Sequence, residues 1–230
     1  APGAGFDLSM TTGPNGDNRL TAGSLAGSGT FQLGGKELTV GSNNLSTNVT
    51  GVLADGGSGG YTGASLVKVG SGRLTLSGIN TYTGVTTIDG GALAVNGDIT
   101  ASSGVTVNAT GMPGGTGIVG NTTIASGGAL APGNSIGTLT VSGNLTFTAG
   151  SFYTVEASPT AADRTNVSGT ATLTGAMVQA VAIPGRFRSQ TYTILTATSG
   201  LSGTFAGITG STFAPGARNP HLIYDLDNVY

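Results

Sequence analysis

Short runs in which apolar and polar residues alternate recur along the chain, with the period of two that is typical of β-strands. They lie at 73–76, 92–95, 104–107, 139–141 and 145–147. Glycine, asparagine and serine bracket the runs, as at Ser77-Gly78 and Asn96-Gly97, which is how strand boundaries are usually marked. Helical periodicity is nearly absent, and only a short turn is expected near 158–163. The pattern predicts an all-β chain.

Repeated strings favour a solenoid over a sandwich or a barrel. The string GGALA occurs at 90–94 and again at 127–131, and GRLTL at 72–76 precedes the first copy by about one coil. Leu74 to Leu93 is 19 residues, Leu93 to Ile118 is 25 and Ile118 to Leu139 is 21. Imperfect periods of about 20 to 25 residues suit stacked coils that bury their apolar faces on one another, and the frequent glycines permit tight corners.

The C-terminal part differs in composition. Nine of the thirteen aromatic residues lie at or beyond Phe147, and longer strands are expected at 191–196 and 221–226. A solenoid end exposes unpaired backbone groups and needs a cap. We therefore expect two parts, with stem coils over 1–150 and a β-hairpin-rich cap over 151–230.

Composition narrows the functional classes. Charged residues are 8% of the chain, the hydrophobic fraction is 37%, and the net charge is −2, which favours order over disorder and argues against a nucleic-acid partner. With no cysteine, disulfides and thiolate chemistry are excluded. No apolar run is long enough for a membrane-spanning helix. The first five residues resemble neither a signal peptide nor a natural start, so the chain is expected to be a piece of a longer protein.

Two enzyme motifs occur but carry little weight. Gly133-Asn134-Ser135-Ile136-Gly137 matches the nucleophile elbow of serine hydrolases, and 115–120 matches a dinucleotide-binding loop. In a chain with 43 glycines, shuffling alone would give roughly 0.7 and about 1.5 such matches. No charged residue or histidine lies between Asp98 and Glu156, the only histidine is His221, and the residues after each motif do not suggest the helix that either fold requires. We expect no catalytic and no cofactor-binding residues.

Metal sites are not expected either. The segment 55–60 has glycines like those of a calcium-binding β-roll, but Gly60 stands where an aspartate is required and the motif does not repeat. Asp225 and Asp227 would share one strand face, where two carboxylates are more often a solvated edge than a site. His221 is expected on a strand surface. N-x-S/T sequons, as at Asn48 and Asn144, follow from the abundance of these residue types.

Several strings, in their order along the chain, resemble the passenger domains of Gram-negative autotransporters, the type V secretion system. LVKVGSGRLTLSG at 66–78, NTYTG at 80–84 and GGAL at 90–93 are similar to the passenger-associated repeat. LAPGNSIGTL at 130–139 is similar to the following coil, so that Ser135 would be a turn residue. YTIL at 192–195, GTF at 203–205 and the end of the chain at 222–230 resemble the pertactin-like autochaperone region. The resemblance covers residues 60–230 approximately.

The resemblance implies a right-handed parallel β-helix, exported through the outer membrane to the bacterial cell surface or the extracellular space. It also implies a C-terminal translocator barrel as a partner, which this chain lacks. The leading hypothesis is a non-catalytic stem of a surface adhesin or virulence factor whose C-terminal part nucleates folding, because a stable first coil can template the next. The expected folding core consists of Leu139, Val141, Phe147, Tyr192, Ile194, Leu195, Phe205, Leu222 and Tyr224.

Two other functional classes remain at this point. The polar outer face could bind host molecules or another copy of the chain through ladders of Thr, Asn and Ser. An enzyme is the least favoured, because no base is placed near either motif in the sequence.

Overall fold

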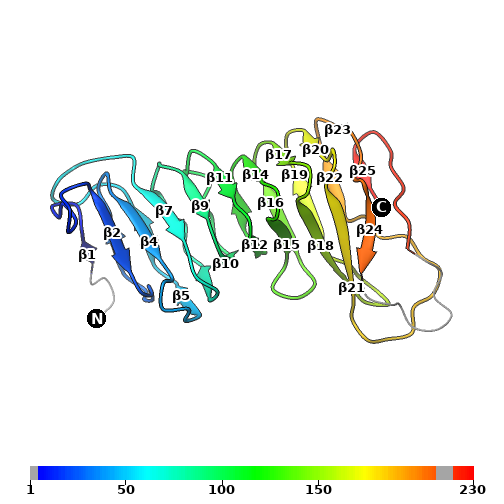
Figure 1. Cartoon of the computed structure of the whole chain (residues 1–230), viewed down its shortest axis with the longest axis horizontal. Coiled ribbons are helices and arrows are strands. Elements are labelled where there is room, and N and C mark those ends of the chain that lie inside the picture. Colours follow the sequence, from blue (N-terminus) through cyan, green and yellow to red (C-terminus); the bar gives the residue numbers. More distant parts are fainter. Residues whose placement is uncertain (1–4, 211–219) are drawn as a thin grey trace.

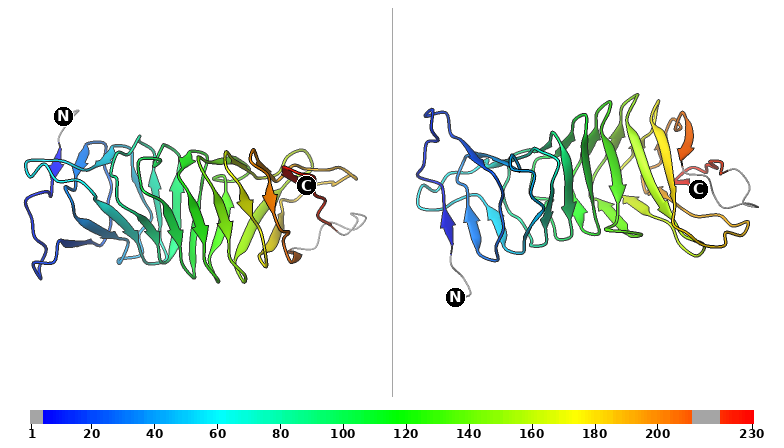
Figure 2. Two further views of the ribbon diagram at one scale, coloured as in Figure 1. Left: turned by 90° about the horizontal axis from the view of Figure 1, so that it is seen from above. Right: turned by 60° about the horizontal axis from the view of Figure 1, so that its bottom comes forward.

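A computed structural model describes residues 5–210 and 220–230. Every regular element in these ranges is a β-strand, which confirms the all-β prediction. The strands stack along one long axis, with the two chain ends at opposite ends of the stack (Figure 1). The two other views show the same elongated stack of coils (Figure 2).

The strands form three faces. The first is a nine-stranded sheet, whose spatial order is β2 (Arg19–Ala22), β4 (Glu37–Val40), β7 (Ser65–Lys68), β9 (Thr86–Ile88), β11 (Val105–Val107), β14 (Thr122–Ile124), β17 (Leu145–Phe147), β20 (Ala171–Thr172) and β23 (Leu201–Ser202). The second is an eight-stranded sheet, whose order is β5 (Thr47–Val49), β8 (Arg73–Leu76), β10 (Gly91–Val95), β12 (Gly111–Gly115), β15 (Ala129–Pro132), β18 (Phe152–Ala157), β21 (Met177–Ala182) and β24 (Gly207–Gly210).

The third face is made of two smaller sheets. The N-terminal one contains β1 (Phe6–Asp7), β3 (Thr30–Gln32) and β6 (Val52–Ala54), and the C-terminal one contains β13 (Ile118–Val119), β16 (Thr138–Val141), β19 (Arg164–Val167), β22 (Leu195–Ala197) and β25 (Asn228–Val229). Single parallel bridges from Ile79 to Asp98 and from Asp98 to Ile118 continue this face. Within residues 5–210 and 220–230, all strand pairs are parallel except β22–β25. The fold is therefore a parallel β-helix.

Alternate residues of each strand point inward and form columns of stacked side chains. In the nine-stranded sheet one such column runs through Val40, Lys68, Ile88, Val107, Ile124 and Phe147. All six are buried. Burying an aliphatic side chain of this size contributes about 1.5–3 kcal/mol, and here that gain exists only when the neighbouring coil is in place.

Lys68 is the one charged member of that column, and it is 1% exposed. Its Nζ donates to the carbonyl oxygens of Val69, Gly70 and Gly90 at 2.8, 3.1 and 3.0 Å. Burial lowers the pKa of the ammonium group. The three hydrogen bonds use all its donors and hold the corner of one coil against the corner of the next.

The predicted repeat spacing is correct from Leu74 to Leu93 and wrong from Leu93 to Ile118. Leu74 pairs with Leu93, as predicted. Leu93, however, pairs with Pro113, whereas Ile118 lies on another face and is 38% exposed. Ile118 pairs with Thr140, one residue beyond the predicted Leu139. The cause is β12, whose sequence GMPGG has no inward aliphatic residue, so the apolar spacing skipped that strand.

The two predicted C-terminal strands are wrong over most of their length. Residues 191–194 are irregular and the strand begins only at Leu195. Of 221–226, only Tyr224 forms a bridge, antiparallel to Val229. Both segments contain alternating apolar residues, but neither has a neighbouring strand to pair with along its length. Instead, Ile223 and Tyr230 exchange two backbone hydrogen bonds, and this hairpin places β25 against β22.

Parallel coils continue through residue 150, since β18 pairs with β15 on one side and β21 on the other. The hairpin at the chain end is the antiparallel feature that follows them. Where a stem ends and a cap begins remains a prediction. The described part of the chain contains no helix of the length and apolarity needed to span a membrane.

Candidate functional site

The hydrolase-like pentapeptide lies in the loop 133–137, which follows Pro132 at the end of β15. Gly133 has φ of 83°, and a Cβ at this position would collide with the Ser135 carbonyl oxygen, so a glycine is required there. Gly133 and Gly115 exchange two backbone hydrogen bonds of 2.8 and 2.9 Å. The chain therefore folds back over the eight-stranded sheet, and Ser135 is exposed in this turn.

The structure does not bring Ser135 and His221 together. Ser135 lines a cleft on the outer surface of the eight-stranded sheet, whereas His221 lines a separate cavity at the C-terminal end. His221 is exposed and lies outside any strand, which corrects the expectation of a strand-surface position. The dinucleotide-like motif spans the end of β12 and the whole of β13, and the next element is strand β14 rather than a helix.

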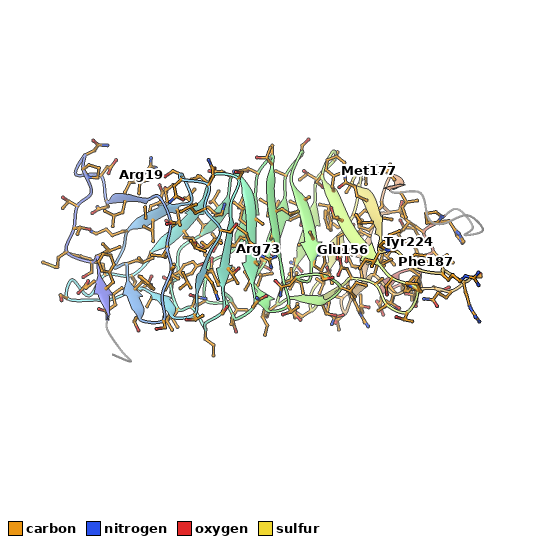
Figure 3. The ribbon with its side chains drawn as sticks, turned by 90° about the horizontal axis from the view of Figure 1, so that it is seen from below. Arg19, Arg73, Glu156, Met177, Phe187 and Tyr224 are labelled. Carbon is orange, nitrogen blue, oxygen red and sulfur yellow. The ribbon has the colours of Figure 1, made fainter. Side chains whose placement is uncertain are left out.

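The cleft beside Ser135 has a volume of about 150 Å³, and we call it the outer cleft. Its floor is made of small or apolar residues, namely Ala92, Ala94, Met112, Pro113, Gly114, Ala131 and Pro132. Arg73 and Asn134 stand at one end, where the guanidinium contacts the Asn134 amide oxygen. Thr154, Glu156 and Asp163 line it as well. Figure 3 places Arg73 and Glu156 in the middle part of the molecule, between Arg19 and Phe187.

Asp163 is the buried charge of the outer cleft, with an exposed fraction of 1%. One carboxylate oxygen accepts from the Gly137 amide at 2.9 Å and the other from the Glu156 amide at 2.8 Å. Burial, with a smaller contribution from the charge of Glu156, raises the pKa of Asp163 to about 6, although the two hydrogen bonds oppose the change. Asp163 thereby ties the loop 133–137 to β18.

The nine predicted folding-core residues lie in or against the interior of the C-terminal coils. Leu139, Val141, Phe147, Ile194, Leu195 and Phe205 are buried. Tyr192, Leu222 and Tyr224 are partly buried and pack against that core. Their role in folding remains a prediction.

An aromatic cluster occupies these coils. The ring centroids of Phe147 and Phe205 are 5.5 Å apart in an edge-on arrangement, and Tyr153 stacks on Phe205 at 5.7 Å. Phe147 and Tyr153 are also 5.7 Å apart. Aromatic pairs of this kind contribute about 0.5–1.5 kcal/mol beyond the area that they bury. Phe147 and Tyr153 lie in the coil of β17 and β18, and Phe205 lies between β23 and β24, so the cluster links these two coils across the coil between them.

Tyr153 was not among the predicted residues, although it is fully buried. Its hydroxyl donates to the Ile194 carbonyl oxygen at 2.5 Å and lies 3.0 Å from the Thr165 hydroxyl. Burial raises the pKa of Tyr153 well above its usual range. The alternation over 152–157 was a usable signal for this residue. Asp163 had no such signal, because its neighbours along the chain are irregular.

A second cavity of about 290 Å³ lies at the C-terminal end. Apolar side chains of β18, β21 and β24 form one wall, including Val155, Val178 and Ile208, and the segments 187–194 and 220–223 form the other. It continues the interior of the solenoid beyond the aromatic cluster.

The acidic residues considered as metal ligands accept hydrogen bonds that stabilise turns instead. Asp225 accepts from the amides of Asp227 and Asn228 and from the Tyr230 hydroxyl, so the predicted strand face shared with Asp227 is wrong. Asp55 accepts from the amides of Gly63 and Ala64 and from the Thr83 hydroxyl. In residues 5–210 and 220–230, no three or more His, Cys, Asp or Glu side chains are grouped so that they could hold a metal ion.

The nine-stranded sheet presents one in-register row of side chains on its outer surface, which we call the threonine column. Register pairs connect every member to the next. The members are Thr21, Thr39, Val67, Thr87, Thr106, Thr123, Thr146, Thr172 and Ser202. None of them is buried, and strand spacing places neighbours about 4.8 Å apart.

Comparison with known sequences gives one family match. Residues 66–95 match the passenger-associated-transport-repeat, and this segment contains most of β7 and the whole of β8, β9 and β10. The match supports an autotransporter passenger, a class of protein exported to the cell surface or the extracellular space and joined to a C-terminal translocator. No curated protein sequence matches the chain.

Proposed function

We propose that the chain is a non-catalytic stem of an autotransporter passenger, from a surface adhesin or virulence factor, and that its C-terminal coils nucleate folding. The observation that carries this proposal is the aromatic cluster, in which Phe147 and Tyr153 of one coil contact Phe205 two coils further on. The resemblance of 192–195, 203–205 and 222–230 to an autochaperone region points to the same part of the chain.

The physical reason lies in the one-dimensional packing of a solenoid. Each coil contacts only its neighbours, so folding spreads from whichever coils are stable first. The C-terminal coils have two advantages in this respect. Their aromatic cluster adds contacts between the coil of β17 and β18 and the coil of β23 and β24, and the hairpin that pairs β25 with β22 covers a strand edge that would otherwise be unpaired.

Two matched leucines test the proposal. Leu195 in β22 and Leu66 in β7 are both 0% exposed, and replacing either by alanine should cost about 2–5 kcal/mol. If the C-terminal coils nucleate folding, Leu195→Ala slows refolding, whereas Leu66→Ala chiefly accelerates unfolding. Stopped-flow refolding and unfolding from denaturant, followed by far-UV circular dichroism, separate the two rates.

Equal slowing of refolding by both variants, or slowing by Leu66→Ala alone, would reject C-terminal nucleation. The aromatic cluster would then no longer support the proposed function, and the stem role would rest on the family match alone. The control is that the refolding rate of the wild-type chain does not depend on protein concentration. Association during refolding would otherwise contribute to the rates being compared.

The threonine column favours a second function, as a surface for association with another copy of the chain or with a host molecule. Its members from Thr87 to Ser202 are uncharged and regularly spaced, so a second copy would meet a row of the same period without charge repulsion. Light scattering over a range of protein concentrations tests this. Thr123→Lys should then reduce the particle size, while Thr140→Lys on the third face should not. A size that is independent of concentration would exclude self-association.

A further inference from the structure

The outer cleft has the features of a small binding site, and neither the stem role nor the family match accounts for them. It is built from strands far apart in the sequence. Arg73 comes from β8, the floor from β10, β12 and β15, and Glu156 from β18. The loop 133–137 lies over one side, and Ala94 beneath it is only 2% exposed. Parallel strands therefore position the floor and the backbone of Arg73 and Glu156, and irregular segments supply Asn134 and Asp163.

The polar groups of the outer cleft keep unused hydrogen-bonding capacity. Arg73 has five side-chain N–H donors, and the one hydrogen bond of its guanidinium within the described chain is with Asn134. The Glu156 carboxylate accepts no hydrogen bond from residues 5–210 or 220–230. Asp163 also lines the cleft, but it is 1% exposed and both of its oxygens already accept a backbone amide. Donors and acceptors thus occur together around an apolar floor.

The size and chemistry of the cleft restrict what it can hold. Its volume of about 150 Å³ is below the roughly 300–1,000 Å³ of pockets that enclose drug-sized ligands, and it suits a single ring. A sugar ring presents an apolar C–H face to a floor such as that of Ala92 and Ala131. Its hydroxyls both donate and accept, as Arg73, Asn134 and Glu156 require together.

We propose that the outer cleft binds one uncharged pyranose ring of a glycan. The ring lies on the floor of β10, β12 and β15, with hydroxyls toward Glu156 at one side and toward Arg73 and Asn134 at the other. Acidic sugars are disfavoured, because the carboxylates of Glu156 and Asp163 line the cleft against the single guanidinium of Arg73. The inference goes beyond the proposed stem role and does not depend on it.

The test is a titration of the nitrogen-15-labelled protein with the methyl glycosides of glucose, galactose, mannose and N-acetylglucosamine, followed by amide chemical shifts. At least one glycoside should shift the amides of Asn134, Gly137 and Glu156 in a saturable manner, with millimolar affinity. Methyl glucuronide should bind at least about tenfold more weakly than that sugar, which is the ratio expected for one unfavourable charge contact.

Two variants locate the site. Glu156→Gln keeps the shape of the side chain and should weaken binding about tenfold, the loss of one charge-assisted hydrogen bond. Ala92→Leu fills the floor and should abolish the shifts. Thr87→Leu, which enlarges an outward side chain on the nine-stranded sheet, is the matched control and should bind as the wild type does. Circular dichroism verifies that each variant is folded.

The proposal is overturned if no glycoside shifts these amides in the folded wild-type chain. It is equally overturned if binding persists unchanged in folded Ala92→Leu. A simple amine such as methylammonium offers a further comparison. If it binds at Glu156 while no glycoside does, the cleft is a cation site and the pyranose assignment is wrong.

Discussion

The middle coils and the C-terminal coils share one sheet but differ in the number of residues per coil, which we call the width of the coil. In the nine-stranded sheet, 17 residues separate Val105 from its partner Thr122, whereas 30 separate Ala171 from Leu201. The interior changes accordingly. Ile124 in the narrow part is followed in the same column by Phe147, and Tyr153 and Phe205 fill the wider space beside it. A longer coil encloses more volume, and close packing then requires larger side chains.

The wider coils also carry more chain outside the strands. The turn around 158–163 brings Asp163 to the outer cleft, and the segment 187–194 lines the second cavity, at the C-terminal end. In the narrow coils, most residues outside the strands belong to short corners. Width therefore provides both the aromatic interior and the irregular segments from which the candidate sites are built.

The largest expected effect comes from exchanging residues between the two regions. Phe147→Ile should lower the free energy of unfolding by about 2–4 kcal/mol, because it leaves a cavity among Tyr153 and Phe205. Ile124→Phe, one coil earlier in the same column, should cost about 1–3 kcal/mol by overpacking. Urea unfolding measures both. If Ile124→Phe were neutral, the narrow interior would have spare volume and the comparison would fail.

An intermediate effect concerns pH. The pKa of Asp163 is raised from 3.8 to about 6, so the folded chain binds one more proton than the unfolded chain between these values. This carboxyl therefore makes the free energy of unfolding increase as pH falls from about 6 towards 4, by an amount on the order of 1 kcal/mol.

Asp163→Asn should remove that part of the pH dependence, while Glu156→Gln should reduce it only slightly, since burial is the larger cause of the shift. Denaturant unfolding at pH 4.5, 6 and 7.5 measures the slope for each variant. A slope that Asp163→Asn leaves unchanged would mean that this carboxyl is not the titrating group.

The smallest effect is local and compares the two ends of the chain. Hydrogen bonds, the strongest from the Tyr230 hydroxyl, lower the pKa of Asp225 to about 2. The stabilisation of the hairpin by this carboxylate is therefore present above pH 3.8 and is lost as pH falls through about 2. Asp225→Asn should accelerate amide hydrogen exchange at Ile223 and Tyr230 several-fold at neutral pH.

The matched change at the other end is Asp7→Asn, where Asp7 accepts from the amides of Ser9 and Ser58. It should accelerate exchange at those two amides and leave the hairpin unaffected. Faster exchange at both ends in either variant would indicate that the solenoid opens as one unit, and that its two ends are not independent.

Much of the stem was predictable because its signals are local. The runs at 73–76 and 92–95 are strands almost as predicted, and Leu74 pairs with Leu93 as the repeat spacing requires. The prediction failed where pairing overrides local pattern. GMPGG at 111–115 is a strand because β10 and β15 flank it, and 191–194 is not a strand despite its alternation.

The candidate sites were less accessible to sequence analysis. Burial of Leu139, Phe147 and Leu195 follows from their apolar character, but the contact between Arg73 and Asn134 joins residues that are three strands apart in the eight-stranded sheet. Ser135 was correctly interpreted as a turn residue. Nothing in its surroundings along the chain indicated that Glu156 and Asp163 line the same cleft.

The sequence by itself determined the strand class, the coil-like repeat and the excess of aromatic residues near the C-terminus, because alternation and composition act over a few neighbouring residues. Tertiary structure alone decided the register of each coil, the position of the outer cleft and the row of the threonine column. Those features depend on which strands pair. Parallel pairing connects residues 17 to 30 positions apart, so the pairing is set by the packing of the whole interior and not by neighbouring residues along the chain.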